Sequence, residues 1–387
     1  MTERQDRTLA LAVDLLTEYA NDIKPRSGSG QDAGPAILAA TLCSVAPDAE
    51  DLCLRALKRW LNDMPAVFRG VGAFGGLGGL LSGLRAVTAL TDAVAPAYSA
   101  LCSQTPEWLA HERWRTNDVS WPDYDLFFGP AGVIRAGLYP GGPTDMVAPA
   151  LQHLISMALT EELEAFRGGP EIDQRSAFNI GRVNTGLGHG IAGVASALAH
   201  ALRGSGYENA RPALRRICDW LVAQTYTDDI GLITWPPVGG LDQESFGTRR
   251  RQAWCYGTPG VSWTLWEAAD SLADDAIREL AENAMTSFIA VFDESLHLDR
   301  DAGENLAVCH GAAGMLAIAD AYARFTLVSS AEALRDHMLD YLIDHAAELR
   351  EHGRHDMSLL TGAGGVAAVA LTATGAERQW LHHIAVR

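Results

Sequence analysis

Apolar and mixed segments alternate along this chain, and a recurring glycine pattern separates them. Gly-x-x-Gly occurs six times at this boundary, and the first glycines of successive copies lie 51 to 67 residues apart. The pairs are Gly76/Gly79, Gly129/Gly132, Gly190/Gly193, Gly257/Gly260, Gly311/Gly314 and Gly362/Gly365. A degraded copy starts at Gln31, where only Gly34 remains. Self-similarity of this kind predicts one structural unit that recurs along the chain.

Each pair is followed by a segment with few charges, and a helix that is apolar nearly all round is buried on most sides. These segments include Leu80–Leu90, Val194–Leu202, Met315–Tyr322 and Val366–Ala373. Each pair is preceded by a more charged, amphipathic helix. The predicted amphipathic helices are Leu9–Asn21, Ala49–Leu61, Asp92–Leu101, Val147–Phe166, Ala210–Gln224, Asp274–Phe292 and Ala331–Leu349. Strand signals are weak, and Gly231–Trp235 is the best candidate.

This alternation predicts an all-α fold: a double α/α barrel, or toroid, of about seven inner and seven outer helices. Residues 1–387 are expected to form this single domain. An open solenoid is the alternative, although solenoid repeats are usually shorter. In a closed ring every inner helix begins at the same end, so the loops before the glycines meet there. Glycine at these helix starts allows close backbone approach.

Composition narrows the classes of function. The chain has 387 residues, 48% of them hydrophobic, and a formal net charge of −18. That charge argues against a nucleic-acid partner, because phosphates need a basic surface. No apolar run of about 18 residues predicts a transmembrane helix. The N-terminus lacks the basic start and apolar core of a signal peptide, so a cytoplasmic location is expected.

The six cysteines show no spacing that indicates a disulfide framework, and a cytosol keeps thiols reduced. Cys43, Cys53, Cys102 and Cys218 lie in apolar helical stretches, where cysteine is usually a small core residue. Cys255 and Cys309 are different because each stands two residues before a repeat glycine.

Two thiolates and one imidazole are a strong zinc set, and His310 directly follows Cys309. Three protein ligands leave one position open, as in catalytic zinc sites, and a thiol bound there is deprotonated. One alternative is two core cysteines and a satisfied histidine. Another is a closed structural site in which His189 is the fourth ligand.

Other reactive residues also stand just before glycine pairs. His189 is a candidate acid or base, because imidazole exchanges protons near neutral pH. Asp125 orients a histidine or relays a proton, or it caps the following helix. Arg251 binds a carbonyl or enolate oxygen, or it belongs to a solvated run of arginines. The histidines predicted to be solvated surface residues are His352, His355, His382 and His383.

Four motifs resemble those of lanthionine synthetase C-like proteins. They are RQAWCYGTPG at 251–260, GHGIAG at 188–193, CHGAAG at 309–314, and DYD at 123–125, which runs on to Gly129. Their order and separations agree with the family, and the glycine repeats extend the resemblance over nearly the whole chain. The resemblance implies a double α-barrel of seven inner and seven outer helices with Zn²⁺ at one end. It implies that Cys255, Cys309 and His310 bind the zinc, and that His189, Asp125, Arg251 and Tyr256 surround it.

The same resemblance implies a lanthipeptide cyclase. Such an enzyme adds a cysteine thiol of a dehydrated precursor peptide to dehydroalanine or dehydrobutyrine, which closes a lanthionine or methyllanthionine ring. The length fits free-standing cyclases, with no room for a fused dehydratase. The implied partners are the precursor peptide, with leader and core, a lanthipeptide dehydratase and an export transporter complex.

The chain also departs from the family. The first repeat lacks its first glycine. Some members carry a small extra domain between barrel helices that is thought to help hold the peptide. The segment Gln104–Pro122 is too short for a full version, although it contains Trp108, Trp114 and Trp121.

Other functions remain as alternatives. Protein prenyltransferase subunits are also α/α barrels with a catalytic zinc, but the adjacent Cys309 and His310 and the glycine repeats favour a cyclase. A non-catalytic scaffold that binds peptide or glutathione is disfavoured because every candidate catalytic residue is retained. A glycoside hydrolase on an α/α toroid is less favoured still, because no convincing pair of carboxylates is found.

Overall fold

The computed structural model describes residues 2–22, 32–64, 70–139, 144–170, 174–240 and 252–387. The structure is mostly helical, with 68% helix and 3% strand, which confirms the predicted class. Its backbone contacts define two units. The first contains Met1–Arg69, Phe74–Leu101 and His297–Arg387, and the second contains Gly70–Ala73 and Cys102–Leu296.

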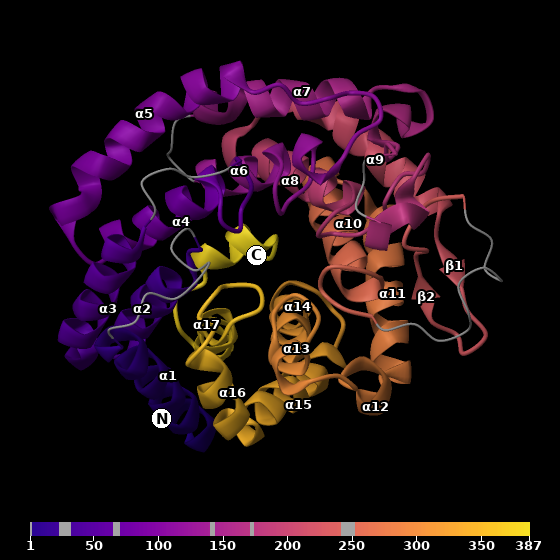
Figure 1. Cartoon of the computed structure of the whole chain (residues 1–387). Helices are drawn as coiled ribbons and strands as arrows, with labels where there is room; N and C mark the ends of the chain where they lie inside the picture. Colours follow the sequence, from indigo (N-terminus) through magenta and orange to yellow (C-terminus); the bar gives the residue numbers. More distant parts are fainter. Residues whose placement is uncertain (1, 23–31, 65–69, 140–143, 171–173, 241–251) are drawn as a thin grey trace. The chain divides into compact units, whose positions relative to one another are not determined.

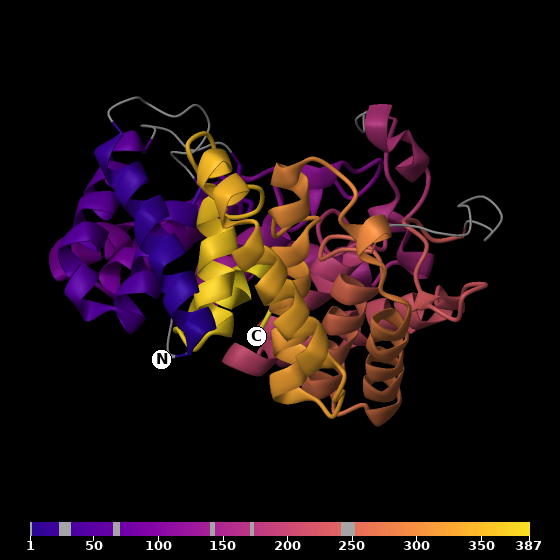
Figure 2. The same cartoon turned by 90° about the horizontal axis from the view of Figure 1, so that it is seen from below.

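In the first unit, four strongly buried helices pack in the order α14, α17, α2 and α4. Figure 2 shows α17 in yellow beside α14 in orange. The four helices are α2 (Gly34–Val45), α4 (Leu77–Thr88), α14 (Ala312–Phe325) and α17 (Ala363–Ala373). A more charged row packs on them: α1 (Glu3–Asn21), α3 (Glu50–Asp63), α15 (Ala331–Asp344) and α16 (Ala346–Gly353). In α17 every residue from Ala363 to Thr372 is buried, whereas α1 buries one face.

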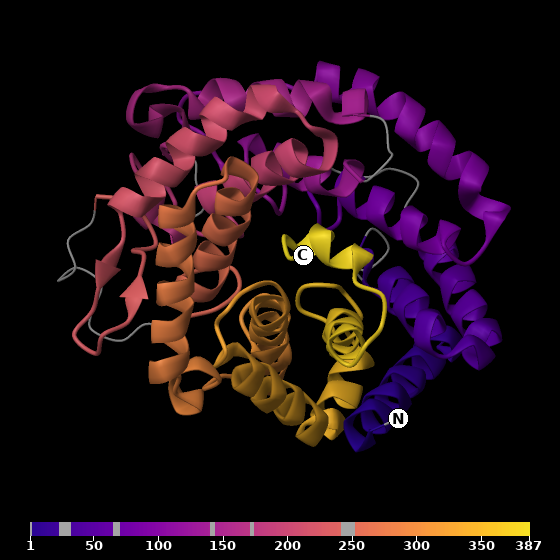
Figure 3. The same cartoon turned by 180° about the vertical axis from the view of Figure 1, so that it is seen from behind.

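The second unit repeats this two-row arrangement. Its buried row is α6 (Pro130–Gly137), α8 (Ile191–Ser205) and α10 (Thr258–Leu272), with α8 in the middle. Its covering row is α7 (Ala148–Ala158), α9 (Arg211–Ala223) and α11 (Asp275–Val291). The antiparallel hairpin of β1 (Tyr226–Thr227) and β2 (Ile233–Thr234) lies beside α11, as Figures 1 and 3 show from opposite sides. Three further helices are α5 (Ala95–His111), α12 (Glu294–His297) and α13 (Ala302–Leu306).

The repeat glycines stand at the starts of buried helices, as predicted. The first glycine of each pair directly precedes α4, α6, α8, α10, α14 or α17. At Gly132, Gly193, Gly260 and Gly365, an added Cβ would lie 1.8–2.4 Å from the carbonyl oxygen of the residue six positions earlier. A side chain cannot fit there, so glycine lets each loop fold back onto the helix that follows it.

Several predicted boundaries are wrong. The helix predicted over Val147–Phe166 ends at Ala158, because the backbone is extended at Thr160; in the 3-10 segment that follows, Glu162 and Leu163 adopt φ of +46° and +52°. The helix predicted over Ala331–Leu349 is interrupted at His345, between α15 and α16. The strand predicted within Gly231–Trp235 is present as β2, but its partner β1 was not predicted.

The core contains one histidine that the sequence placed in solvent. His383 is fully buried, because the C-terminal 3-10 helix Gln379–Ile384 packs against α4 and brings its Nδ1 to 2.6 Å from Ser82 Oγ. Cys53 and Cys218 are buried, as expected, and burial raises the pKa of each thiol to about 12. Cys43 and Cys102 are partly exposed.

None of the helices in the described ranges combines the length and apolar character needed to cross a bilayer.

Candidate metal centre and proton-transfer pair

Cys309 and His310 end the loop that leads into α14. The backbone N–H of Cys309 donates to the carbonyl of Leu360 at 3.0 Å, which fixes the loop beside the start of α17. Cys309 is 4% exposed, whereas His310 is exposed. The Sγ of Cys309 lies 3.6 Å from Nε2 of His310. A sulfur and a nitrogen bound to one tetrahedral zinc are separated by about 3.6 Å, so this pair already has ligand spacing.

Cys255 lies in the loop before α10, and two local contacts hold that loop. Gly257 has φ +82°, and Gln252 Oε1 accepts a hydrogen bond from the N–H of Thr258 at 2.7 Å. A Cβ at Gly257 would lie 2.1 Å from that same oxygen. The carbonyl of Cys255 accepts hydrogen bonds from the N–H groups of Leu187 and Gly188, at 2.9 and 3.2 Å. Cys255 is therefore 3% exposed and held against the histidine motif.

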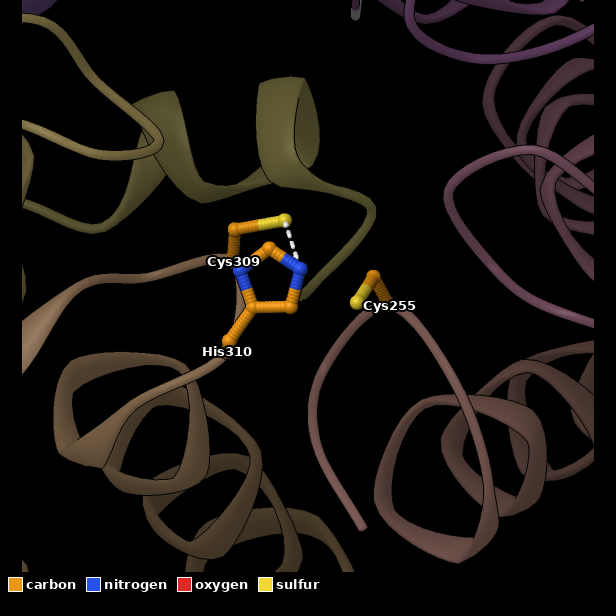
Figure 4. Close-up of side chains that lie close together, drawn as sticks. All are labelled: Cys255, Cys309 and His310. Carbon is orange, nitrogen blue, oxygen red and sulfur yellow. Dashed lines mark hydrogen bonds between the residues drawn. The ribbon is translucent and has the colours of Figure 1, made fainter. Parts of the chain in front are cut away.

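The predicted ligands Cys255, Cys309 and His310 come together. One potential ligand atom from each lies within 4.8 Å of the other two. Figure 4 shows the His310 ring between the two cysteine side chains. Two thiols and an imidazole are a ligand set whose chemistry suits zinc.

His189 and Asp125 form a direct pair. Nδ1 of His189 lies 2.6 Å from Oδ2 of Asp125, and the carboxylate is fully buried. Oδ1 of Asp125 accepts hydrogen bonds from the N–H groups of Phe128 and Gly129, at 2.7 and 2.9 Å. Asp125 thus orients a histidine, one of the roles that the sequence left open, and it stabilises the turn before α6, whose N-cap Gly129 receives no side-chain cap. Burial raises the pKa of this carboxyl, and the hydrogen bond from His189 opposes the rise.

Three aromatic rings that sequence reasoning did not assign to the site surround the His189 imidazole. The ring centres of Phe127, Trp121 and Phe128 lie 4.4, 4.7 and 5.8 Å from it, with interplanar angles of 30°, 32° and 21°. The Trp-rich segment before Asp125 and the Phe-Phe pair after it were the available signals. Only the fold shows that they converge on His189.

Of the last two predicted site residues, the structure describes Tyr256 but not Arg251. The hydroxyl of Tyr256 accepts a hydrogen bond from Asn184 Nδ2 at 2.7 Å, which ties the residue after Cys255 to the loop that carries His189. Arg251 lies outside the described residues. Its role therefore stays a prediction.

A repeated helical fold with a Cys-Cys-His cluster and an Asp-His pair is what the motif resemblance predicts. Comparison with known protein families gives the same result. The family model "Lanthionine synthetase C-like protein" matches residues 32–382, and the chain belongs to that family. The resemblance predicted from the motifs is confirmed.

Two comparisons with individual proteins agree with this family. The chain is similar to the nisin biosynthesis protein NisC of Lactococcus lactis subsp. lactis, with 22% identity over 263 residues. That match covers 62% of this chain and 58% of NisC, which is less than two thirds of the relative's length. The solved structure of a nisin cyclase superposes with a TM-score of 0.80 at 17% identity, over 99% of this chain and 98% of that one. The two chains share a fold.

Proposed function

We propose that this protein is a lanthipeptide cyclase, which adds a peptide cysteine thiol to a dehydroalanine or dehydrobutyrine of a dehydrated precursor and closes a thioether ring. The observation that carries the proposal is the convergence of Cys255, Cys309 and His310. Membership of the lanthionine synthetase C-like family supports it. The family match also disfavours a prenyltransferase and a non-catalytic scaffold.

The three converging residues are proposed to bind Zn²⁺ as Cys255 Sγ, Cys309 Sγ and an imidazole nitrogen of His310. Three ligands leave a fourth tetrahedral position open. Zinc held by these three residues would lower the pKa of a substrate thiol and so supply a thiolate at neutral pH.

The Asp125–His189 pair is proposed to supply the proton that completes the addition. A new C–S bond forms at the β-carbon, the π electrons of the double bond move toward the carbonyl, and the α-carbon then takes a proton. Because Nδ1 of His189 is directed to Asp125, proton exchange with the substrate runs through Nε2. The thiol proton lost at the start replaces the proton donated by His189, so atoms and charge balance.

Tyr256 and Arg251 are proposed to act on the substrate carbonyl. Tyr256 is held by Asn184 and follows Cys255 directly, so it is suited to position the peptide beside the metal. Arg251 precedes the loop of Cys255, and a guanidinium there would stabilise the enolate oxygen.

The larger assembly also belongs to this proposal. The helices are proposed to close into a double barrel of seven inner and seven outer helices that forms one domain over residues 1–387. The proposed partners are the dehydrated precursor, a dehydratase and an export transporter complex, in the cytoplasm.

The direct test uses a synthetic peptide with one dehydroalanine and one cysteine. Ring closure conserves mass, so the readout is the loss of a thiol that N-ethylmaleimide can alkylate. Zinc-loaded protein is expected to remove that thiol. Treatment with a chelator should slow closure by at least roughly 100-fold, and added zinc should restore it. Persistence of the free thiol with zinc-loaded protein, or equal rates after chelation, would contradict the proposal.

A further inference from the structure

Exposed aromatic side chains are concentrated beside His189, and proton transfer by His189 does not itself require them. Phe128 is 47% exposed, and Trp121 and Phe127 are partly exposed. The His189 side chain among them is 25% exposed. Large aromatic side chains that stay open to solvent beside a reactive group commonly mark a binding surface. We call these three rings the aromatic wall.

The aromatic wall is held in place before any ligand arrives. The segment around Trp121 is fixed by Asp123, whose carboxylate accepts hydrogen bonds from the N–H and Nε of Arg115, at 2.9 and 3.1 Å. The same carboxylate accepts from the N–H of Ser120 at 2.7 Å, and Arg115 also donates to Ser120 Oγ at 2.8 Å. This network sets the direction in which Trp121 leaves the backbone.

The two phenylalanines are held from the other side. The N–H of Phe128 donates to Asp125, the same carboxylate that orients His189. A Cβ on Gly188 would lie 2.6 Å from the ring of Phe127 and 3.3 Å from Cβ of Cys255, so the ring packs directly against the loop that carries His189. A preorganised wall binds a ligand at a low cost in side-chain entropy.

Distance identifies what the wall can contact. If His189 protonates the α-carbon of a dehydroamino acid, the α-carbons of the two flanking residues lie about 3.8 Å from that atom. Because the rings border the imidazole, with centres 4.4 and 5.8 Å from its centre for Phe127 and Phe128, a side chain of a flanking residue is within reach of the exposed Phe128 ring.

We propose that the aromatic wall binds an apolar side chain next to the dehydroamino acid of the substrate peptide, and that Phe128 determines this preference. The proposal rests on the proposed function and specifies its substrate class. The more exposed Phe128 is the contact with the peptide, while Trp121 and Phe127 mainly hold His189.

The test compares two short peptides that each contain one cysteine and one dehydroalanine, with leucine on both sides of the dehydroalanine or with serine on both sides. Wild-type protein should close the leucine peptide with a kcat/KM roughly tenfold higher, because a half-covered leucine gains about that much. Phe128→Ala should abolish the preference, because it slows closure of the leucine peptide about tenfold more than closure of the serine peptide. Phe128→Leu should retain most of it.

Phe325→Ala is the matched control. Phe325 is 39% exposed at the end of α14, where the guanidinium groups of Arg378 and Arg387 lie over its ring, so its removal should leave the preference unchanged. Binding of fluorescent analogues with alanine in place of dehydroalanine gives a readout that needs no chemistry. A leucine preference in binding that is lost in Phe128→Ala supports the wall even if no ring closes, and in that case only the cyclase proposal fails. Equal binding and closure of both peptides by wild-type protein, or a preference that survives in Phe128→Ala, would overturn the wall.

Discussion

At the scale of single residues, the hydrogen bonds that each side chain already makes determine which of its atoms can contact the substrate. Asp125 uses one oxygen for the backbone of Phe128 and Gly129 and the other for Nδ1 of His189. The tautomer of His189 therefore follows from the folded backbone of its neighbour. A single change at Asp125 tests this dependence.

Asp125→Asn is expected to lower ring closure by roughly 10²–10⁴-fold, the range for loss of a proton donor or of its tautomer. The amide can still accept from the two N–H groups, but it presents an NH₂ group to Nδ1 and favours the wrong imidazole tautomer. Zinc content should stay at the wild-type level, which elemental analysis measures. Asp275→Asn, at a side chain that is 92% exposed, is the control and should be silent. Normal activity in Asp125→Asn would remove the pair from the mechanism.

Cys309→Ala is expected to lose both bound zinc and ring closure, because two remaining ligands hold the metal poorly. Cys218→Ala removes another buried thiol, from α9, and should keep both. Zinc content and thiol loss are measured together on each variant. Full zinc occupancy in Cys309→Ala would show that the metal, if bound, uses other ligands.

At the scale of elements, the loops are shaped by the helices that they precede. The carbonyl of Trp254 occupies the place of a side chain at Gly260, and the same contact recurs at three other helix starts. Each reactive residue before a glycine pair is therefore positioned by its own helix.

Gly260→Ala should destabilise the protein by roughly 1–3 kcal/mol or more, because its Cβ would lie 1.9 Å from the Trp254 carbonyl oxygen. Gly204→Ala is the matched change near the end of α8, where nothing lies within 4 Å. There alanine should stabilise by roughly 0.5–1 kcal/mol through higher helix propensity. Denaturant unfolding of both variants measures the difference. Equal effects would show that the close approach at Gly260 is unimportant.

The sequence predicts the elements better than their ends. Glycine pairs and apolar runs locate the buried helices, because burial on all sides leaves a signal in every residue. The break at Glu162 and Leu163 leaves none, because neither residue commonly adopts positive φ. Among site residues, Cys255, Cys309, His310, His189 and Asp125 are recognisable by type and by place in the repeat. Trp121 and Phe128 are not, since aromatic residues usually serve packing and only the fold brings them to His189.

At the scale of the whole molecule, contacts between distant parts of the sequence hold the first unit together. Oδ1 of Asp32 accepts hydrogen bonds from the N–H groups of Gly34 and Leu359, both at 2.7 Å, and so joins the start of α2 to the loop before α17. Burial raises the pKa of this carboxyl to about 7, and the charge of Asp356 adds to the rise.

Asp32 is therefore expected to make stability depend on pH. Its pKa is higher in the folded state than in the unfolded chain, so between about pH 4 and 7 the folded protein keeps a proton that the unfolded chain has lost. Its contribution is fully present below about pH 4 and is lost as the pH rises through 7, on the order of 4 kcal/mol in all. Asp32→Asn keeps an acceptor oxygen and removes the titration. The free energy of unfolding, measured by denaturation from pH 4 to 8, should fall less steeply with pH for this variant than for the wild type. The same dependence on pH in both proteins would show that Asp32 is not the titrating group.

The way in which the two units divide the chain affects the order in which they can fold during synthesis. The second unit is drawn almost wholly from the continuous stretch Cys102–Leu296, whereas the first needs both Met1–Arg69 and His297–Arg387. Because translation proceeds from the N-terminus, the middle of the chain can fold on the ribosome while the early helices still lack their C-terminal neighbours. Cys309 and His310 come after that stretch in the sequence. A chain that ends before Cys309 therefore carries Asp125 and His189 without two of the proposed metal ligands, and under the proposed function it is expected not to close rings.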